Sequence, residues 1–219
     1  MTTNTLSKYY RKINSVYQRD KKGVFIPEFA DPLYEEYLDE SWMWYYKWNG
    51  TNVGFEVGGD VFGRTERTAL TDEQWGVVRR WQKAIEPNVQ PEVKYVYGEL
   101  VGPGVQGNPH QLDRLTVVTF DTYTDRDRYN CNAVNLSHGM GLFFDIPFDP
   151  EASYDALFFG HGSITLRQMI DLFREGDPGR LFDSPAYFEG VIGYPWTNLN
   201  GRPYQEIATK IKVEDRWSW

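Results

Sequence analysis

Alternating apolar and polar positions predict seven β-strands along the chain. The run TVVTFDTYT is rich in β-branched and aromatic residues, which favour a pleated, half-buried strand. In the last predicted strand, Lys210 and Lys212 should point to one face and Ile211 to the other, because strand side chains alternate. The predicted strands are Trp42–Trp48, Thr51–Val57, Val61–Thr65, Val93–Leu100, Leu115–Tyr123, Phe188–Gly193 and Ile207–Glu214.

Two segments have the 3.6-residue period and the end signals of helices. In TDEQWGVVRRWQKAIE, Thr71 is expected to cap the helix. In TLRQMIDLFREGDPG, Thr165 and Gln168 predict a capping box, and Gly176 and Pro178 predict the end of the helix. Together with the strands, these helices predict a mixed α+β fold, mostly antiparallel, with helices inserted between strands.

Turn signals and length limit the domain organisation. Gly58 and Gly59 predict a two-residue hairpin turn, because glycine adopts positive φ without strain. The 219 residues suit one large domain or two small ones, and no repeat, low-complexity run or linker divides them.

Composition predicts a soluble protein of the reducing cytoplasm. Hydrophobic residues make up 41% of the chain and aromatic residues 16%, which argues against disorder. Cys131 is the single cysteine, so no internal disulfide can form. The polar N-terminus lacks the apolar region of a secretory leader, and no stretch is long and apolar enough to span a membrane.

The charge balance restricts the partners. The net charge is 23 − 31 = −8, which counts against a general nucleic-acid coat protein, since such proteins are usually basic. A local cationic groove remains compatible with this total, because a site responds mainly to nearby charge.

Charged residues inside apolar strands are the candidate chemistry. Lys47 in YYKWNGTN is either an edge-strand lysine reaching water or a functional amine. Lys210 and Lys212 form either a solvated face or a rigid pair that grips phosphate oxygens. Glu99 and Glu189 are costly to bury alone, so each either pairs with a structural arginine, coordinates a metal or accepts sugar hydroxyls.

Several common sites are not indicated. Phe120 suits the core or a base-stacking platform. His110, His138 and His161 are too widely spaced for a zinc motif, and Cys131 has no CxxC partner. The sequence also lacks a P-loop, a GxGxxG turn and a GxSxG elbow.

The order of the short motifs resembles the covalent nucleotidyltransferases, the superfamily of ATP-dependent ligases and mRNA capping enzymes. Within it, the chain is most similar to bacteriophage-type ATP-dependent RNA ligases. Six motifs carry the resemblance across nearly the whole chain, and the opening YYRKINSVYQRDKKG is also similar. The motifs are KWNGTN, ERT, YGELVGPGVQGN, TFDTY, EGVIG and KIK.

The resemblance implies a fold and an activity. The fold would be a nucleotidyltransferase (ATP-grasp-like) domain over residues 1–219, with two mainly antiparallel sheets, flanking helices and a nucleotide cleft between the sheets. An end at Trp219 would leave no room for an OB-type domain, which favours RNA over nicked DNA. The activity would join RNA 5′-phosphate and 3′-hydroxyl ends using ATP and Mg²⁺ or Mn²⁺.

The resemblance also implies residue roles. Lys47 would attack the α-phosphorus of ATP to form lysyl-AMP, helped by the cations Lys210 and Lys212. Apolar walls from Trp44 and Trp48 would favour the neutral amine that attack requires. Glu99 would accept ribose hydroxyls, Phe120 would stack on adenine, Glu189 would bind metal, and Arg67 or Arg64 would hold phosphates. The remaining nucleotide-binding positions would be Tyr46, Asn49, Gly50 and Asn52.

Two departures leave alternatives open. Asn49 stands where many relatives have Asp, and Tyr46 stands where phage relatives often have Glu. Another enzyme reading is a DNA ligase or guanylyltransferase-like protein, and a non-enzyme reading is an inactive homologue that binds nucleotide or RNA. Retention of both glutamates and all three lysines argues against the inactive homologue.

Overall fold

The computed structural model describes residues 8–124, 128–129, 164–175, 189–195 and 207–213. The chain divides into two compact units, and one of the places where it passes from one unit to the other lies between Trp48 and Asn49, inside the KWNGTN segment. Unit 1 contains the described residues 8–11, 49–124 and 128–129. Unit 2 contains the described residues 12–48, 164–175, 189–195 and 207–213.

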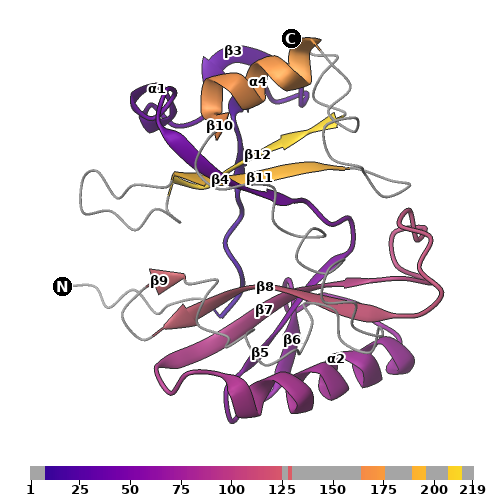
Figure 1. Cartoon of the computed structure of the whole chain (residues 1–219). Coiled ribbons are helices and arrows are strands. Elements are labelled where there is room, and N and C mark those ends of the chain that lie inside the picture. Colours follow the sequence, from indigo (N-terminus) through magenta and orange to yellow (C-terminus); the bar gives the residue numbers. More distant parts are fainter. Residues whose placement is uncertain (1–7, 125–127, 130–163, 176–188, 196–206, 214–219) are drawn as a thin grey trace. The chain divides into compact units, whose positions relative to one another are not determined.

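Unit 1 is built on a five-stranded antiparallel sheet with the strand order β6-β5-β7-β8-β9 (Figure 1). Four of its strands were predicted, with ends that differ by one or two residues. The strands are β5 (Thr51–Glu56), β6 (Val61–Gly63), β7 (Val93–Val101), β8 (Thr116–Thr124) and β9 (Arg128–Tyr129).

The β5–β6 connection is longer than predicted. The Glu56 N–H donates to the Asp60 carbonyl oxygen at 3.1 Å, and the Gly59 N–H donates to the Glu56 carbonyl oxygen at 2.9 Å. Gly58 has φ +74°, as a turn glycine should. The loop therefore holds three residues, Val57, Gly58 and Gly59, because Val57 no longer pairs with β6.

Helix α2 (Asp72–Ile85) covers one face of the unit 1 sheet (Figure 1). Its predicted cap is confirmed: the Thr71 hydroxyl accepts from the Gln74 N–H, and the Gln74 amide oxygen accepts from the Thr71 N–H. Trp81 is fully buried, and its indole N–H donates to the Thr119 hydroxyl at 2.9 Å. The short 3-10 helix η1 (Glu86–Asn88) follows α2. The core of unit 1 thus lies between α2 and the sheet.

Unit 2 is built on a second five-stranded sheet, with the order β1-β12-β11-β4-β10. All neighbours are antiparallel except β1 and β12. The strands predicted around Trp44, Val191 and Ile211 are confirmed, while Phe188 and Glu214 lie outside the described residues. The strands are β1 (Asn14–Ser15), β4 (Ser41–Tyr46), β10 (Ile164–Thr165), β11 (Gly190–Pro195) and β12 (Thr209–Lys212).

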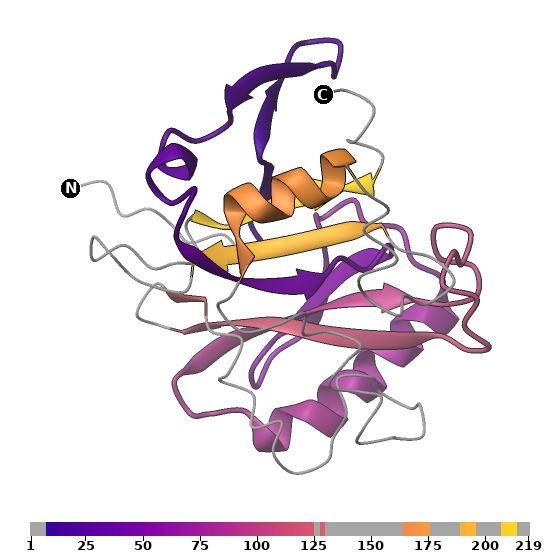
Figure 2. The same ribbon diagram turned by 45° about the horizontal axis from the view of Figure 1, so that its top comes forward.

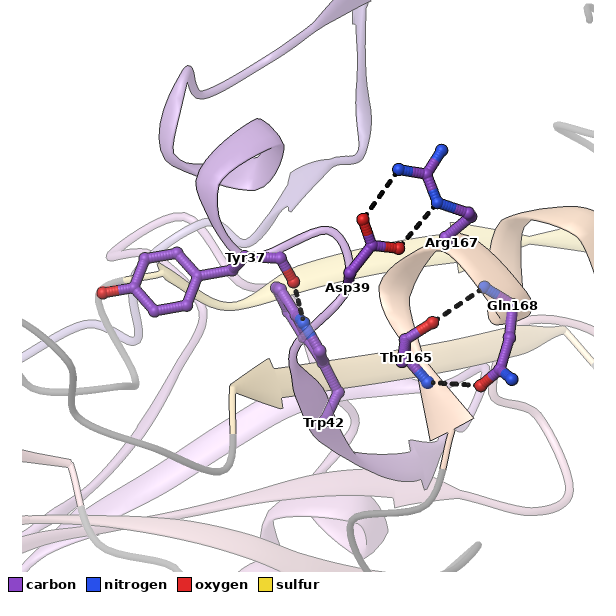
Figure 3. A network of polar contacts seen from close by, with 6 residues as sticks. All are labelled: Tyr37, Asp39, Trp42, Thr165, Arg167 and Gln168. Carbon is purple, nitrogen blue, oxygen red and sulfur yellow. Dashed lines mark hydrogen bonds and ion pairs between the residues drawn. The ribbon is translucent and has the colours of Figure 1, made fainter.

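Helix α4 (Leu166–Glu175) lies over one face of the unit 2 sheet (Figures 1 and 2). Its capping box is confirmed: the Gln168 N–H donates to the Thr165 hydroxyl at 3.1 Å, and the Thr165 N–H donates to the Gln168 amide oxygen at 2.9 Å (Figure 3). The expected stop at Gly176 and Pro178 lies outside the described residues. The helix buries Leu166, Met169, Ile170 and Phe173.

A hairpin and a short helix complete unit 2. The hairpin consists of β2 (Tyr17–Arg19) and β3 (Phe25–Phe29), and α1 spans Leu33–Glu36. The Tyr34 hydroxyl donates to the Ala208 carbonyl oxygen at 3.0 Å, which ties α1 to the segment before β12. Among the helices that the structure describes, none has the length and apolar character to span a bilayer.

Candidate functional site

One face of the unit 2 sheet carries lysines. On β12, Thr209 and Ile211 are buried, whereas Lys210 and Lys212 are partly exposed, so the predicted alternation is confirmed. The register places Gly190 of β11 opposite Lys212. This face of the sheet is the opposite of the face that packs under α4.

Glu189 joins two lysines on this face. Its Oε2 lies 2.6 Å from the Lys47 ammonium nitrogen, and its Oε1 lies 3.2 Å from the Lys212 ammonium nitrogen. The exposed fractions of the three side chains are 10% for Glu189, 18% for Lys47 and 22% for Lys212. Three segments far apart in sequence therefore bring one carboxylate and two ammonium groups together.

The backbone holds these three residues at the ends of adjacent strands. The Lys47 N–H donates to the Gly190 carbonyl oxygen, and the Val213 N–H donates to the Glu189 carbonyl oxygen, both at 2.9 Å. Gly190 has φ +153°, and a Cβ there would collide with the Ile211 carbonyl oxygen. Glycine after Glu189 therefore permits β11 and β12 to approach closely beside the carboxylate.

The structure contradicts the part of the expected apolar wall around Lys47 that Trp44 was to form. Trp44 is 1% exposed, stacks on Trp42 with ring centroids 5.6 Å apart, and donates its indole N–H to the Ile164 carbonyl oxygen. It belongs to the core on the α4 face. The group that lies beside the Lys47 amine is the Glu189 carboxylate.

Tyr46 lies on the other side of the sheet from the lysines. It pairs with Val191 of β11, and Val191 is fully buried in the unit 2 core. Residues directly opposite in an antiparallel ladder share a face. A contact between Tyr46 and a nucleotide stays a prediction.

The sequence left several roles open for Glu189, among them a partner for an arginine and a ligand for a metal ion. Among the residues that the structure describes, its oxygens contact two lysines and no arginine. Among the described residues, no three side chains of the metal-ligating types His, Cys, Asp and Glu cluster together. A metal at Glu189 would then take most of its ligands from phosphate and water, which Mg²⁺ commonly does.

In unit 1, the structure brings Gly50, Asn52 and Glu99 together. A Cβ on Gly50 would collide with the Leu100 carbonyl oxygen and lie 2.9 Å from the Glu99 Cγ. Asn52 pairs directly with Glu99 across β5 and β7, so both side chains lie on the face opposite α2. The Asn52 Oδ1 is buried and has no hydrogen-bond partner among the described residues. Buried acceptors of this kind usually have a partner, which suits a ligand donor.

His110 is a functional candidate that the sequence pattern missed. The Asn49 N–H donates to its Nε2 at 3.0 Å, across 61 residues of sequence. A single histidine that accepts a backbone N–H follows no fixed spacing in the sequence, so no motif indicates it.

Phe120 lies at an irregularity of β8. Tyr97 pairs with Asp121 but Gly98 pairs with Thr119, which leaves Phe120 outside the ladder as a β-bulge. The Tyr10 ring meets Phe120 nearly edge-on at 5.0 Å, and the Tyr10 hydroxyl donates to the buried Asp121 carboxylate at 2.9 Å. Stacking of Phe120 on adenine stays a prediction.

The two candidate arginines belong to one exposed turn of unit 1. Arg64 and Arg67 are exposed in the turn after β6. Neither side chain makes a hydrogen bond or an ion pair with another residue that the structure describes. Their proposed contacts with phosphates stay predictions.

Solved structures provide the comparison with known proteins. The chain is similar to Naegleria gruberi RNA ligase without ligand, in a single-residue variant, at 19% identity and TM-score 0.54 over 96% of this chain and 62% of that one. It is similar to the same ligase with pyrophosphate at 19% identity and TM-score 0.53, over 94% and 62%. A variant of the ligase with ATP and Mn matches at 19% identity and TM-score 0.53, over 95% of this chain and 64% of that one.

The likeness shows a shared mixed α+β fold. The chain spans about 62% of the length of the ligase structures that it matches. No protein-family model matches the sequence, and no curated protein matches it.

Proposed function

We propose that this chain has the adenylyltransferase chemistry of an ATP-dependent RNA ligase and joins 5′-phosphate and 3′-hydroxyl ends through lysyl-AMP on Lys47. The proposal rests on one observation: the Glu189 carboxylate forms ion pairs with both Lys47 and Lys212. The fold shared with an RNA ligase that has been solved with ATP and Mn, and with AMP and Mn, supports it independently.

In the first step, the neutral Lys47 Nζ attacks the α-phosphorus of ATP. A nitrogen–phosphorus bond forms, the bond to the bridging oxygen breaks, and pyrophosphate leaves with the electron pair. The ammonium form cannot attack, so Lys47 must exchange its contact with Glu189 and lose a proton when ATP binds. A divalent ion, held by Glu189 and the phosphates, would supply neutralisation of phosphate charge.

Lys210 and Lys212 would stabilise the charge that develops on the α-phosphate. The 5′-phosphate of the RNA then takes AMP from Lys47, which breaks the nitrogen–phosphorus bond and returns the amine. Finally, the 3′-hydroxyl oxygen attacks that 5′-phosphate, the phosphodiester forms and AMP leaves. The roles of Glu99 with ribose, Phe120 with adenine and Arg67 or Arg64 with phosphate belong to the same proposal.

A labelling experiment tests the first step. Purified protein is incubated with α-labelled ATP or GTP and Mg²⁺ or Mn²⁺, and the denatured protein is weighed by intact-mass spectrometry. We expect an acid-labile AMP adduct in the wild type and in K83A, whose lysine is exposed on α2, but none in K47A. Preferential labelling by GTP would favour a guanylyltransferase. Absence of every adduct would favour a nucleotide- or RNA-binding homologue.

A sealing assay tests the substrate. Because the chain carries a charge of −8, only a local groove can attract RNA, and few phosphates should be contacted. We therefore expect a shallow salt dependence, with log K falling by about 0.7 per phosphate for each tenfold rise in salt. Single-stranded or nicked RNA should be joined faster than nicked DNA. Equal rates on nicked DNA would contradict the RNA assignment while leaving the lysyl-AMP chemistry intact.

A further inference from the structure

The loop after β7 is a chain of three turns. We call residues Gly102–Leu112 the His110 loop. The Val105 N–H donates to the Gly102 carbonyl oxygen at 3.1 Å, the Asn108 N–H to the Val105 carbonyl oxygen at 2.7 Å, and the Gln111 N–H to the Asn108 carbonyl oxygen at 3.0 Å. Each turn begins where the previous one ends, so the loop has a defined path from β7 to β8.

The backbone of the His110 loop is unusual. Three residues that are not glycine, Gln106, Asn108 and Gln111, have φ values of 46°, 48° and 54°. Such left-handed conformations are unfavourable for residues with a Cβ and persist where the surroundings impose them. The observation indicates that the loop is held in one conformation.

Two kinds of contact hold it. The Asn108 side chain donates to the Leu112 carbonyl oxygen at 2.9 Å and accepts from the Leu112 N–H at 3.1 Å, which closes a ring around His110. Val105 is 3% exposed in the core under α2, and the Gln74 amide donates to the Gly104 carbonyl oxygen at 3.3 Å. The loop is therefore anchored to the rigid part of unit 1.

The His110 side chain extends from this loop and contacts Asn49 of the KWNGTN segment. The imidazole Nε2 accepts the Asn49 N–H at 3.0 Å, so this nitrogen carries no proton. The next residue, Gly50, packs directly against the backbone of β7 at Leu100. The Asn49–Gly50 step is thus held from one side by the imidazole and from the other by β7.

We propose that His110 is a positioning residue that fixes the Asn49–Gly50 backbone, which leads into the strand that carries Asn52, and so prepares this segment for nucleotide binding. The proposal rests on the function proposed above. In this role His110 acts on the Asn49–Gly50 backbone and holds it in place before the nucleotide arrives.

Three variants distinguish the effect of the hydrogen-bond acceptor at His110 from the effect of the imidazole ring. H110A removes the acceptor, H110Q keeps one at the position of Nε2, and D113A is a matched control at an exposed site in the same region. We expect H110A to raise the apparent KM for ATP in adduct formation by about 10- to 100-fold, the range for residues that orient a binding group. The kcat should change less, and H110Q and D113A should stay near wild type.

A second readout does not depend on catalysis. Hydrogen exchange of the Asn49 amide, followed by NMR without nucleotide, should be faster in H110A and near normal in H110Q. This measurement tests whether His110 holds the Asn49 N–H even if the wild type forms no adduct. The absence of an adduct would count against the proposed function and leave the role of His110 to be judged by the exchange rates. If H110A does not fold, H110N replaces it, because its shorter amide cannot reach Asn49.

Two results would overturn the proposal. One is unchanged Asn49 exchange in H110A, together with an unchanged KM for ATP where an adduct forms. The other is equal damage in H110Q and H110A, which would show that the imidazole ring is needed for packing and that its acceptor nitrogen is not.

Discussion

Two ion pairs in unit 2 have nearly the same length and different surroundings. Lys47 and Glu189 lie 2.6 Å apart with 18% and 10% of their side chains exposed. Arg167 and Asp39 lie 2.7 Å apart with 53% and 71% exposed. Arg167 donates to both Asp39 oxygens, at 2.7 and 2.8 Å (Figure 3). Distance alone therefore does not distinguish them.

The difference lies in what replaces each contact when it breaks. Water can solvate Asp39 and Arg167 at once, so the exposed pair contributes little despite its two parallel bonds. Glu189 is largely shielded and divides its oxygens between two lysines from separate strands. One lysine can leave while the other stays, which suits a site whose amine must become free. The comparison predicts large effects at Glu189 and small ones at Asp39.

The largest effect is expected for E189Q. This change leaves the ammonium groups of Lys47 and Lys212 close together without the carboxylate, which should destabilise the protein by about 1–3 kcal/mol. Adduct formation should fall by about 100-fold or more, as for loss of a group placed at the reacting centre. Urea unfolding and intact-mass kinetics measure the two effects. D39N serves as the matched control, and a wild-type rate in E189Q would remove Glu189 from the site.

Next come the lysines of β12. K212A should lower the rate of adduct formation by about 100-fold, the size expected when a donor to developing phosphate charge is lost. K210A should act in the same direction, and K212R should recover little, because a planar guanidinium differs in shape from an ammonium group. K212A and K210A should both stay folded, which circular dichroism can check. Near-normal rates in both alanine variants would show that this strand face is only solvated surface.

The capping box beside the exposed ion pair should matter more than the pair itself. T165A removes the acceptor for the Gln168 N–H at the start of α4, which should cost about 1 kcal/mol. A protein of this size should then melt about 2–4 °C lower. T165S retains the hydroxyl and should melt like wild type. A loss in D39N equal to that in T165A would contradict this ranking.

The smallest effect is expected for D39N, and it should depend on pH. The hydrogen bond from Arg167 lowers the pKa of Asp39 below its ordinary 3.8. A lowered folded pKa means that the pair stabilises the protein above 3.8 and stops doing so as the pH falls through the lowered value. The small gap between the urea midpoints of wild type and D39N at pH 6 should therefore close in strong acid and shrink in 1 M salt. A gap that widens in acid would reverse the assigned sign.

Local features could be read from the sequence. The Thr71 and Thr165 caps were predicted correctly, because a capping box involves residues only three positions apart. The faces of Lys210 and Ile211 were also predicted correctly, because alternation is a property of the strand itself. Strand ends shifted by one or two residues where the ladder partner, and not the residue type, decides the last hydrogen bond.

Long-range partners could not be read in this way. Lys47 was singled out as a candidate from its position in the strand, but its partner Glu189 is 142 residues away, and Trp44, expected to wall the amine, lies on the opposite face of the sheet. The order β12-β11-β4 brings Lys212, Glu189 and Lys47 together at the ends of three adjacent strands, and no spacing in the chain encodes that order. The same holds for His110 and Asn49. By itself the sequence determined which residues carry charge and which face of a strand they take, since these depend on neighbours in the chain. Which carboxylate meets which amine was decided by the tertiary structure alone, because it depends on how strands distant in sequence pair.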